Sequence, residues 1–296
     1  MNVLVTGASG FIGRVLTRRL VAAGYPVRAL IRRAEEREVL TGAECVIGDL
    51  RDPASLDRAA AGMEAIVHLA CATGVARASL VRAVNVEGTR ALLEAASGRG
   101  ARRFIFVSSV SAARVRMGPY GRTKREGEAL VAGSRLEWVI LRPSLVFGPG
   151  GEGLFARLAA SLKALPLVPV IGDGRIALDP VHVDDVCAVI EQCLARADVV
   201  GRTYDLLGPE RLTFDELLLR LGTALGVKPR LLHVPAAIAL PLARVLGFLV
   251  ERPPVSEDNV LGMISPARVD GAPARRDFPL RWTPLEAGLA GLGRAA

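Results

Sequence analysis

The sequence predicts an α/β protein built on a doubly wound parallel sheet, with a smaller C-terminal lobe. Short apolar runs alternate with amphipathic helical segments as far as residue 142, which is the order that such a sheet requires. A glycine cluster follows the first apolar run directly. Beyond residue 142 the alternation stops and prolines become frequent. We therefore expect a sheet domain over residues 1–142 and a lobe formed mainly by residues 143–296.

The first strand is expected at residues 3–5, and a glycine turn of spacing Gly-x-x-Gly-x-x-Gly follows it. Glycine triplets also occur in ordinary turns. Here the triplet lies between a buried strand and an amphipathic helix, as in a Rossmann-type dinucleotide-binding unit. Glycines let a pyrophosphate approach the backbone, and the helix N-terminus offers N–H groups to it. The residues expected to contact the nucleotide here are Gly7, Ser9, Gly10, Phe11, Ile12 and Gly13.

The second strand, residues 27–31, is followed by Arg32 and Arg33. At this point of an NAD site an acidic residue usually binds the ribose hydroxyls, whereas an arginine suits a 2′-phosphate. Both arginines could equally belong to an ordinary solvated charge run. We favour the phosphate role, which predicts NADP as the cofactor and leaves NAD as the alternative.

Further short apolar runs predict strands at residues 44–47, 65–70, 104–107 and 136–141, and residues 79–97 predict a helix. Asp49 follows the third strand, where its carboxylate could accept from an adenine amino group or cap the helix that begins near Pro53. His68 has no carboxylate close in sequence, so we interpret it as a core histidine.

In the lobe, residues 183–194 predict a helix and 203–207 a strand, and both are expected to return to the sheet domain. Residues 234–250 are strongly apolar, but Pro235, Pro241 and Arg244 interrupt them and the run is too short to span a membrane. We interpret the run as a buried or lid helix beside the substrate cleft. Contact with a membrane surface is the alternative.

Composition narrows the function classes. Apolar residues make up 51% of the chain and charged residues 23%, which is typical of an ordered globular protein. The net charge is +8, but the arginines are scattered singly without interleaved aromatic residues, so we predict no nucleic-acid partner. The first strand begins almost at Met1, which predicts no signal peptide. The cysteines have no metal or redox spacing, so we predict no metal site and buried thiols in a reducing cytoplasm; they are Cys45, Cys71, Cys187 and Cys193.

Tyr120 and Lys124 are spaced i and i+4, which places them on one face of a helix that Pro119 can begin. A tyrosine is a poor base at neutral pH unless a cation lies beside it, and Lys124 supplies one. The pair suits proton transfer to or from a carbonyl or alcohol oxygen. Ser109 follows the fifth strand and could hydrogen-bond the same oxygen.

These pieces together resemble the extended and atypical short-chain dehydrogenase/reductases, often called NAD-dependent epimerase/dehydratases. The matching segments occur in family order and cover roughly residues 1–210. They are residues 6–13, 48–50, 68–70, 85–89, 107–109, 120–124, 141–149 and 182–186. Residues 203–206 and 212–217 look like the subgroup related to the nucleotide-binding accessory subunit of respiratory complex I.

The resemblance implies roles for individual residues. Tyr120 would be the acid/base, Lys124 would bind the nicotinamide ribose, and Ser109 would orient the substrate oxygen. Ser108 and Ser111 compete with Ser109, because the stretch between serine and tyrosine is short. The further residues implied are Asn85 in the active site, Asp49 and Leu50 at the adenine, Leu69 and Ala70 in the cofactor site, and Pro143 near the nicotinamide.

The sequence therefore predicts a cytoplasmic NAD(P)-dependent oxidoreductase or epimerase acting on a small carbonyl, alcohol or sugar-type substrate. The alternative is a non-enzymatic protein that holds NADP(H) for assembly or sensing, as some relatives of the complex I subunit are thought to do. RNA binding is a third reading, which fits only the net charge.

Overall fold

The computed structural model describes residues 1–73, 77–150, 154–250 and 255–289. A parallel sheet of seven strands, in the order β11-β6-β5-β4-β1-β2-β3, forms the larger body. Its strands are β1 (Val3–Thr6), β2 (Val27–Ile31), β3 (Glu44–Ile47), β4 (Ala65–His68), β5 (Arg103–Val107), β6 (Glu137–Pro143) and β11 (Arg202–Leu206). The predicted α/β fold with a parallel central sheet is confirmed.

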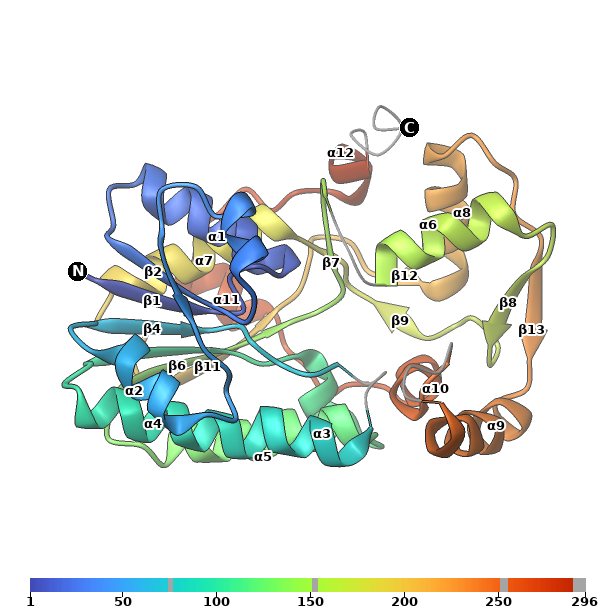
Figure 1. Cartoon of the computed structure of the whole chain (residues 1–296). Coiled ribbons are helices and arrows are strands. Elements are labelled where there is room, and N and C mark those ends of the chain that lie inside the picture. The colour runs from blue at the N-terminus through green and yellow to red at the C-terminus, as the bar shows by residue number, and fades with distance from the viewer. Residues whose placement is uncertain (74–76, 151–153, 251–254, 290–296) are drawn as a thin grey trace.

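Helices cover both faces of this sheet, which explains why its strands are apolar throughout (Figure 1). Val3 and Val5 point to one face and join the core around Leu16, whereas Leu4 between them joins the core around Leu56 on the other. The first face carries α1 (Phe11–Ala22), α7 (Val183–Ala195) and α11 (Ala272–Asp277). The second carries α2 (Pro53–Ala60), α4 (Gly88–Gly98) and α5 (Pro119–Ala132).

The helix predicted over residues 79–97 is interrupted in the structure. It consists of α3 (Ala78–Arg82), a π-helical turn η2 (Ala83–Glu87) and α4. Such a turn inserts one residue into the helical repeat and changes the direction of the side chains that follow. Asn85, which the sequence analysis expects in the active site, lies in this π-helical turn.

The lobe consists of short strand pairs and helices around a second apolar core (Figure 1). Its strands are β7 (Val146–Phe147), β8 (Val168–Ile171), β9 (Ala177–Leu178), β10 (Val181–His182), β12 (Leu212–Thr213) and β13 (Leu231–Val234). Its helices are α6 (Leu154–Ala164), α8 (Phe214–Ala224), α9 (Ala236–Leu249), α10 (Glu257–Ile264) and α12 (Leu285–Leu289).

After the first segments of the lobe, the chain contributes α7 and β11 to the sheet body. Helix α7 packs against α1, and β11 pairs with β6 in parallel, with Arg202 opposite Val139. A later segment returns as well, because α11 packs against β11 and Phe278 is fully buried in the sheet core. The sequence analysis did not predict this second return.

The apolar run at residues 234–250 forms the end of β13 and then α9, which continues through Pro241. A helix is thus present in this run as predicted, and Pro241 does not end it. A proline in a helix removes one backbone donor, and the alanines and leucines around it keep the remaining turns. Among the residues that the structure describes, no helix is long and apolar enough to cross a membrane.

All the cysteines are free, but the expectation that every one is buried is wrong for two of them. Cys187 and Cys193 are buried under α1 and β5, where burial raises the pKa of Cys193 to about 12. Cys45 and Cys71 are only half-buried. Strand β4 ends at His68, so Cys71 lies just beyond it, at the carboxyl ends of the parallel strands.

Candidate active site

A cavity of about 580 Å³ opens at the carboxyl edge of the sheet. Parallel strands bring the turns that follow them to one edge, so residues far apart in sequence line it together. The expected site residues in its lining are Gly7, Ser9, Gly10, Phe11, Ile12, Gly13, Arg32, Asp49, Leu50, Leu69, Ala70, Ser109, Tyr120 and Pro143. The lining does not include Arg33, Asn85, Ser111 or Lys124.

The glycine turn at one end of the cavity accepts no side chain at two of its positions. Gly7 has φ +69°, and a Cβ there would lie 2.7 Å from the backbone nitrogen of Ala70. A Cβ on Gly13 would lie 2.1 Å from the Gly7 carbonyl oxygen. Helix α1 starts here with no side-chain cap and no acidic residue in its first turn. Its free N–H groups therefore fit the pyrophosphate of a dinucleotide.

The two arginines after β2 lie in different places. Arg32 lines the cavity, whereas the Arg33 side chain is 74% exposed and pairs with Glu36. The Glu36 carboxylate lines the cavity beside Arg32 and accepts hydrogen bonds from Ser9 Oγ (2.9 Å) and the Arg32 backbone nitrogen (3.2 Å). Burial opposes ionisation there, but these hydrogen bonds lower the pKa of Glu36, so it is an anion at neutral pH.

Asp49 and Leu50 line the cavity beyond β3. A bidentate pair with Arg51, at 2.9 and 2.8 Å, is the main reason that the pKa of Asp49 falls to about 2. The helix-cap alternative for Asp49 is wrong, because Asp52 caps α2 by accepting from the Ala54 backbone nitrogen at 3.1 Å.

Tyr120, in the first turn of α5, and Ser109, just after β5, adjoin one another in the lining of the cavity. Burial raises the pKa of Tyr120 well above its ordinary value. The neighbouring Cys71 thiol raises that pKa further, and a hydrogen bond with Ser109 lowers it. The phenol is therefore neutral and faces both a hydroxyl and a thiol. Cys71, which the sequence analysis treated as a buried thiol, is a lining residue.

Lys124 lies one turn after Tyr120 on the same helix, beneath the cavity. Its ammonium is fully buried, donates to the Val107 carbonyl oxygen at 2.7 Å and lies 4.3 Å from the centre of the Phe106 ring. Burial lowers the pKa of Lys124. The carbonyl that it holds belongs to Val107, a residue of the cavity lining.

The hydrogen bonds distinguish the three candidate serines. Ser108 Oγ donates to Glu128 Oε1 at 2.5 Å, and Glu128 is held in turn by Arg142 at 2.7 Å. Ser111 donates its backbone nitrogen to Ser109 Oγ and is absent from the described lining of the cavity. Ser109 is the serine that adjoins Tyr120.

Asn85 holds the loop beyond β4, whereas His68 lies in the core. Asn85 exchanges hydrogen bonds with the Ala72 backbone, at 2.7 and 3.0 Å, and donates to Thr123 on α5. The π-helical turn therefore fixes this loop against the helix that carries Tyr120. His68 bridges Thr6 and Thr89 in the core, where burial lowers its pKa to about 3 and keeps it neutral.

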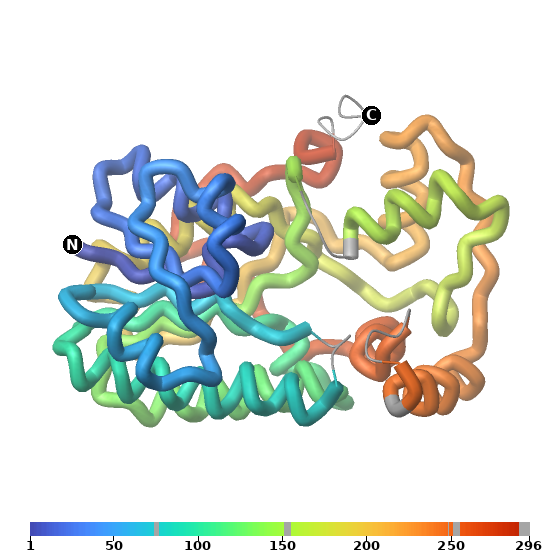
Figure 2. Tube along the Cα trace, viewed as in Figure 1, coloured from blue at the N-terminus to red at the C-terminus, as the bar shows by residue number. Residues whose placement is uncertain are grey.

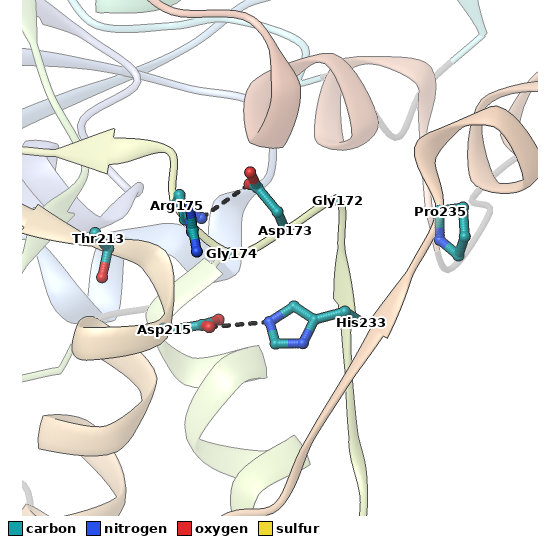
Figure 3. A pocket seen from close by; sticks show the side chains of 8 residues that line it. All are labelled: Gly172, Asp173, Gly174, Arg175, Thr213, Asp215, His233 and Pro235. Atoms are coloured by element: carbon teal, nitrogen blue, oxygen red, sulfur yellow. Dashed lines mark hydrogen bonds and ion pairs between the residues drawn. The ribbon is translucent and has the colours of Figure 1, made fainter.

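A second cavity, of about 650 Å³, lies in the lobe between the β8–β9 turn, the start of α8 and β13 (Figure 3). His233 Nε2 lies 2.9 Å from Asp215 Oδ2 across it, so the pair ties β13 to α8. The sequence analysis assigned none of its lining residues to a functional site. Within the described ranges, no group of three or more His, Cys, Asp or Glu side chains could hold a metal ion.

The chain is similar to a protein family, to individual reductases and to a solved dehydratase structure. Residues 3–206 match the model of the NAD dependent epimerase/dehydratase family. The chain is 36% identical to the ceramide reductase of Caulobacter vibrioides, over 79% of this chain and 73% of that one. It is 30% identical to the 2-alkyl-3-oxoalkanoate reductase of Stenotrophomonas maltophilia, over 94% of each. A dTDP-glucose 4,6-dehydratase structure from Streptomyces venezuelae with NAD bound is 26% identical, with a TM-score of 0.78 over 99% of this chain and 96% of that one.

Proposed function

The chain belongs to the NAD-dependent epimerase/dehydratase family of oxidoreductases, and from that premise we propose that it reduces the ketone of an alkyl-bearing substrate with NADPH. One observation carries the proposal: Tyr120 and Ser109 line the same cavity as the glycine turn. A nucleotide held by that turn would extend toward the pair along one continuous surface.

The cofactor would be held by the uncapped start of α1 at its pyrophosphate and by Asp49 and Leu50 at its adenine. Arg32 would meet the 2′-phosphate, since it is the arginine of the pair that lines the cavity. Bound NADPH would supply the hydride. Lys124 supports the floor beneath the reaction centre through the Val107 carbonyl.

The proton of the reaction would come from Tyr120. A phenol with a raised pKa keeps its proton at neutral pH, so it is ready to protonate the oxygen of a ketone as that oxygen gains negative charge. Ser109 hydrogen-bonds the same hydroxyl and would orient the substrate oxygen. In this protonated state Tyr120 can donate a proton for reduction, whereas the reverse reaction would need the phenolate.

An alkyl-bearing substrate suits the apolar part of the cavity lining, which includes Leu80, Val84 and Val146. The names of two relatives, a reductase of 2-alkyl-3-oxoalkanoates and a ceramide reductase, support this class. The relation to the complex I accessory subunit, and with it a purely structural role for the nucleotide, stays a prediction.

The test is a substrate panel followed by the loss of reduced-nicotinamide absorbance, with a 2-alkyl-3-oxoalkanoate, a long-chain acylamino ketone and UDP-glucuronic acid. We expect turnover of an alkyl ketone, and we expect Tyr120→Phe to lower the rate by about 10²–10⁴-fold without weakening nucleotide binding. Tyr25→Phe is the matched control, since Tyr25 packs in the core beside α1. Tight NADPH binding with no turnover of any ketone would instead support the structural role.

A further inference from the structure

Helix α9 exposes a row of large apolar side chains. Among the side chains that the structure describes, four of the five most exposed large apolar residues lie on this helix. They are Ile238, Leu242, Val245 and Leu249, with exposed fractions of 62%, 56%, 54% and 75%. Monomeric proteins scatter such residues singly, so a cluster on one element marks a surface that another body covers.

The spacing of these residues makes the row continuous. They lie at i, i+4, i+7 and i+11, which at about 100° per residue confines them to roughly 60° of the helix circumference over about 16 Å. The inner side of α9 is formed by small residues, and Ala239 and Ala243 are buried against Val260 of α10. The helix is therefore anchored on one side and apolar on its outer side.

The position of α9 is fixed at its start and along its body. Its first residue follows Pro235, and β13 just before it is tied to α8 by the His233–Asp215 pair (Figure 3). Its body packs on α10, as the chain trace shows (Figure 2). Asp258 of α10 accepts hydrogen bonds from the backbone nitrogens of Tyr120 and Gly121 at 3.1 and 3.3 Å. One helix thus separates the exposed row from the turn that carries Tyr120.

The charge of the protein indicates what covers the row. The helix carries no acidic residue, and its one charged residue, Arg244, pairs with Glu257 of α10 at 2.9 Å, so attraction to an anionic surface would come from the charge of the protein as a whole. The whole chain has a net charge of +8. A cationic protein with an apolar helical face is complementary to a bilayer that has anionic headgroups above an apolar interior.

We propose that the outer row of α9, formed by Ile238, Leu242, Val245 and Leu249, lies in the interface of an anionic lipid membrane. The buried-helix interpretation of residues 234–250 describes only the inner side. The proposal is independent of the reaction assigned above, since it concerns a surface and not the cavity. It places the lobe side of the active site next to the bilayer.

The experiment is co-sedimentation of the full chain with vesicles of phosphatidylcholine, alone or mixed with phosphatidylglycerol, at low and physiological salt. We expect at least tenfold more protein on the anionic vesicles, with weaker binding at the higher salt. The variant Ile238→Gln/Leu242→Gln/Val245→Gln should lose at least tenfold of that binding. The matched control is Leu165→Gln/Leu219→Gln, which changes exposed leucines elsewhere in the lobe and should bind like wild type.

A single change, Val245→Glu, repeats the test with a milder substitution in case the triple variant does not fold. It places an anion in the row and should also release the protein from anionic vesicles. Equal sedimentation of wild type and row variants would overturn the proposal. So would light scattering that shows a dimer of the free protein which the row variants dissociate, since a second copy would then cover the face.

Discussion

At the scale of single residues, the proton of Tyr120 is controlled by its immediate neighbours. Burial and the Cys71 thiol raise the pKa of Tyr120, and Ser109 lowers it. A proton donor works only while it is protonated. Ketone reduction should therefore stay near its maximum through neutral pH and decline as the pH rises through that raised pKa.

The first prediction concerns Cys71, which acts on this pKa without being a proton donor itself. Replacing it by Ala removes one group that raises the pKa of Tyr120. The alkaline decline in the rate of reduction should then begin at a lower pH than in wild type. The measurement is the pH profile of kcat/KM for both proteins, with Cys45→Ala as control because Cys45 lies on β3. An unshifted profile would show that the thiol does not influence Tyr120.

A second prediction separates Arg32 from Arg33, which the sequence treats alike. Arg32→Ala should weaken NADP⁺ binding by about ten- to a hundredfold, since a charge-assisted phosphate contact is worth about 1.5–3 kcal/mol. Arg33→Ala is the matched control and should bind NADP⁺ almost as wild type, because its side chain is outside the cavity lining. Fluorescence titration measures the dissociation constants of NADP⁺ and NAD⁺ for wild type and both variants. The affinity for NAD⁺ should change little in either variant. Equal losses from both arginines would contradict the assignment.

Sequence reasoning reaches most residues of the cavity lining because turns after parallel strands must meet at one edge. It missed Glu36 and Cys71 for identifiable reasons. Glu36 comes after the position where an acidic residue is usual, and it reaches back only because the 3₁₀ helix η1 (Ala34–Val39) follows β2. The place of Cys71 in the cavity could not be predicted, because a single cysteine without a second one at metal or redox spacing forms no recognisable motif. The depth of Lys124 likewise depends on packing against Phe106, which spacing does not reveal.

At the scale of elements, the strands of the sheet were predictable because burial on both faces leaves short apolar runs between polar turns. Strand β2 begins and ends at the predicted residues, as does β3. Irregular helices were less predictable. The π-helical turn at Ala83–Glu87 leaves the apolar periodicity of its flanks intact, so the pattern indicates one continuous helix. Helix α9 was predicted despite Pro241, and the good helix formers on both sides of that proline offset its local cost.

At the scale of the whole molecule, the segment formed by α11 and Phe278 belongs to the sheet body. Phe278 is fully buried in the sheet core, and its ring meets that of Tyr204 edge-on at 4.9 Å. Asp277 accepts a hydrogen bond from the Tyr204 hydroxyl at 2.8 Å and pairs with Arg202 on β11. Sequence alone could not show this return, because six helical residues after a long lobe carry no signal of their destination.

The last prediction follows from that connection. Phe278→Ala should lower the free energy of unfolding by about 3–5 kcal/mol, the usual cost of removing a buried phenylalanine ring. Because the ring packs on β11, the sheet body should lose stability, although residue 278 follows most of the lobe in the sequence. Urea unfolding measures the free energy, and NADP⁺ fluorescence during heating reports the sheet body itself. Nucleotide binding should be lost at a lower temperature than in wild type, and Phe278→Leu should show the same change to a smaller degree. If binding instead survived to the wild-type temperature while another transition moved down, the segment would be stabilising only the lobe.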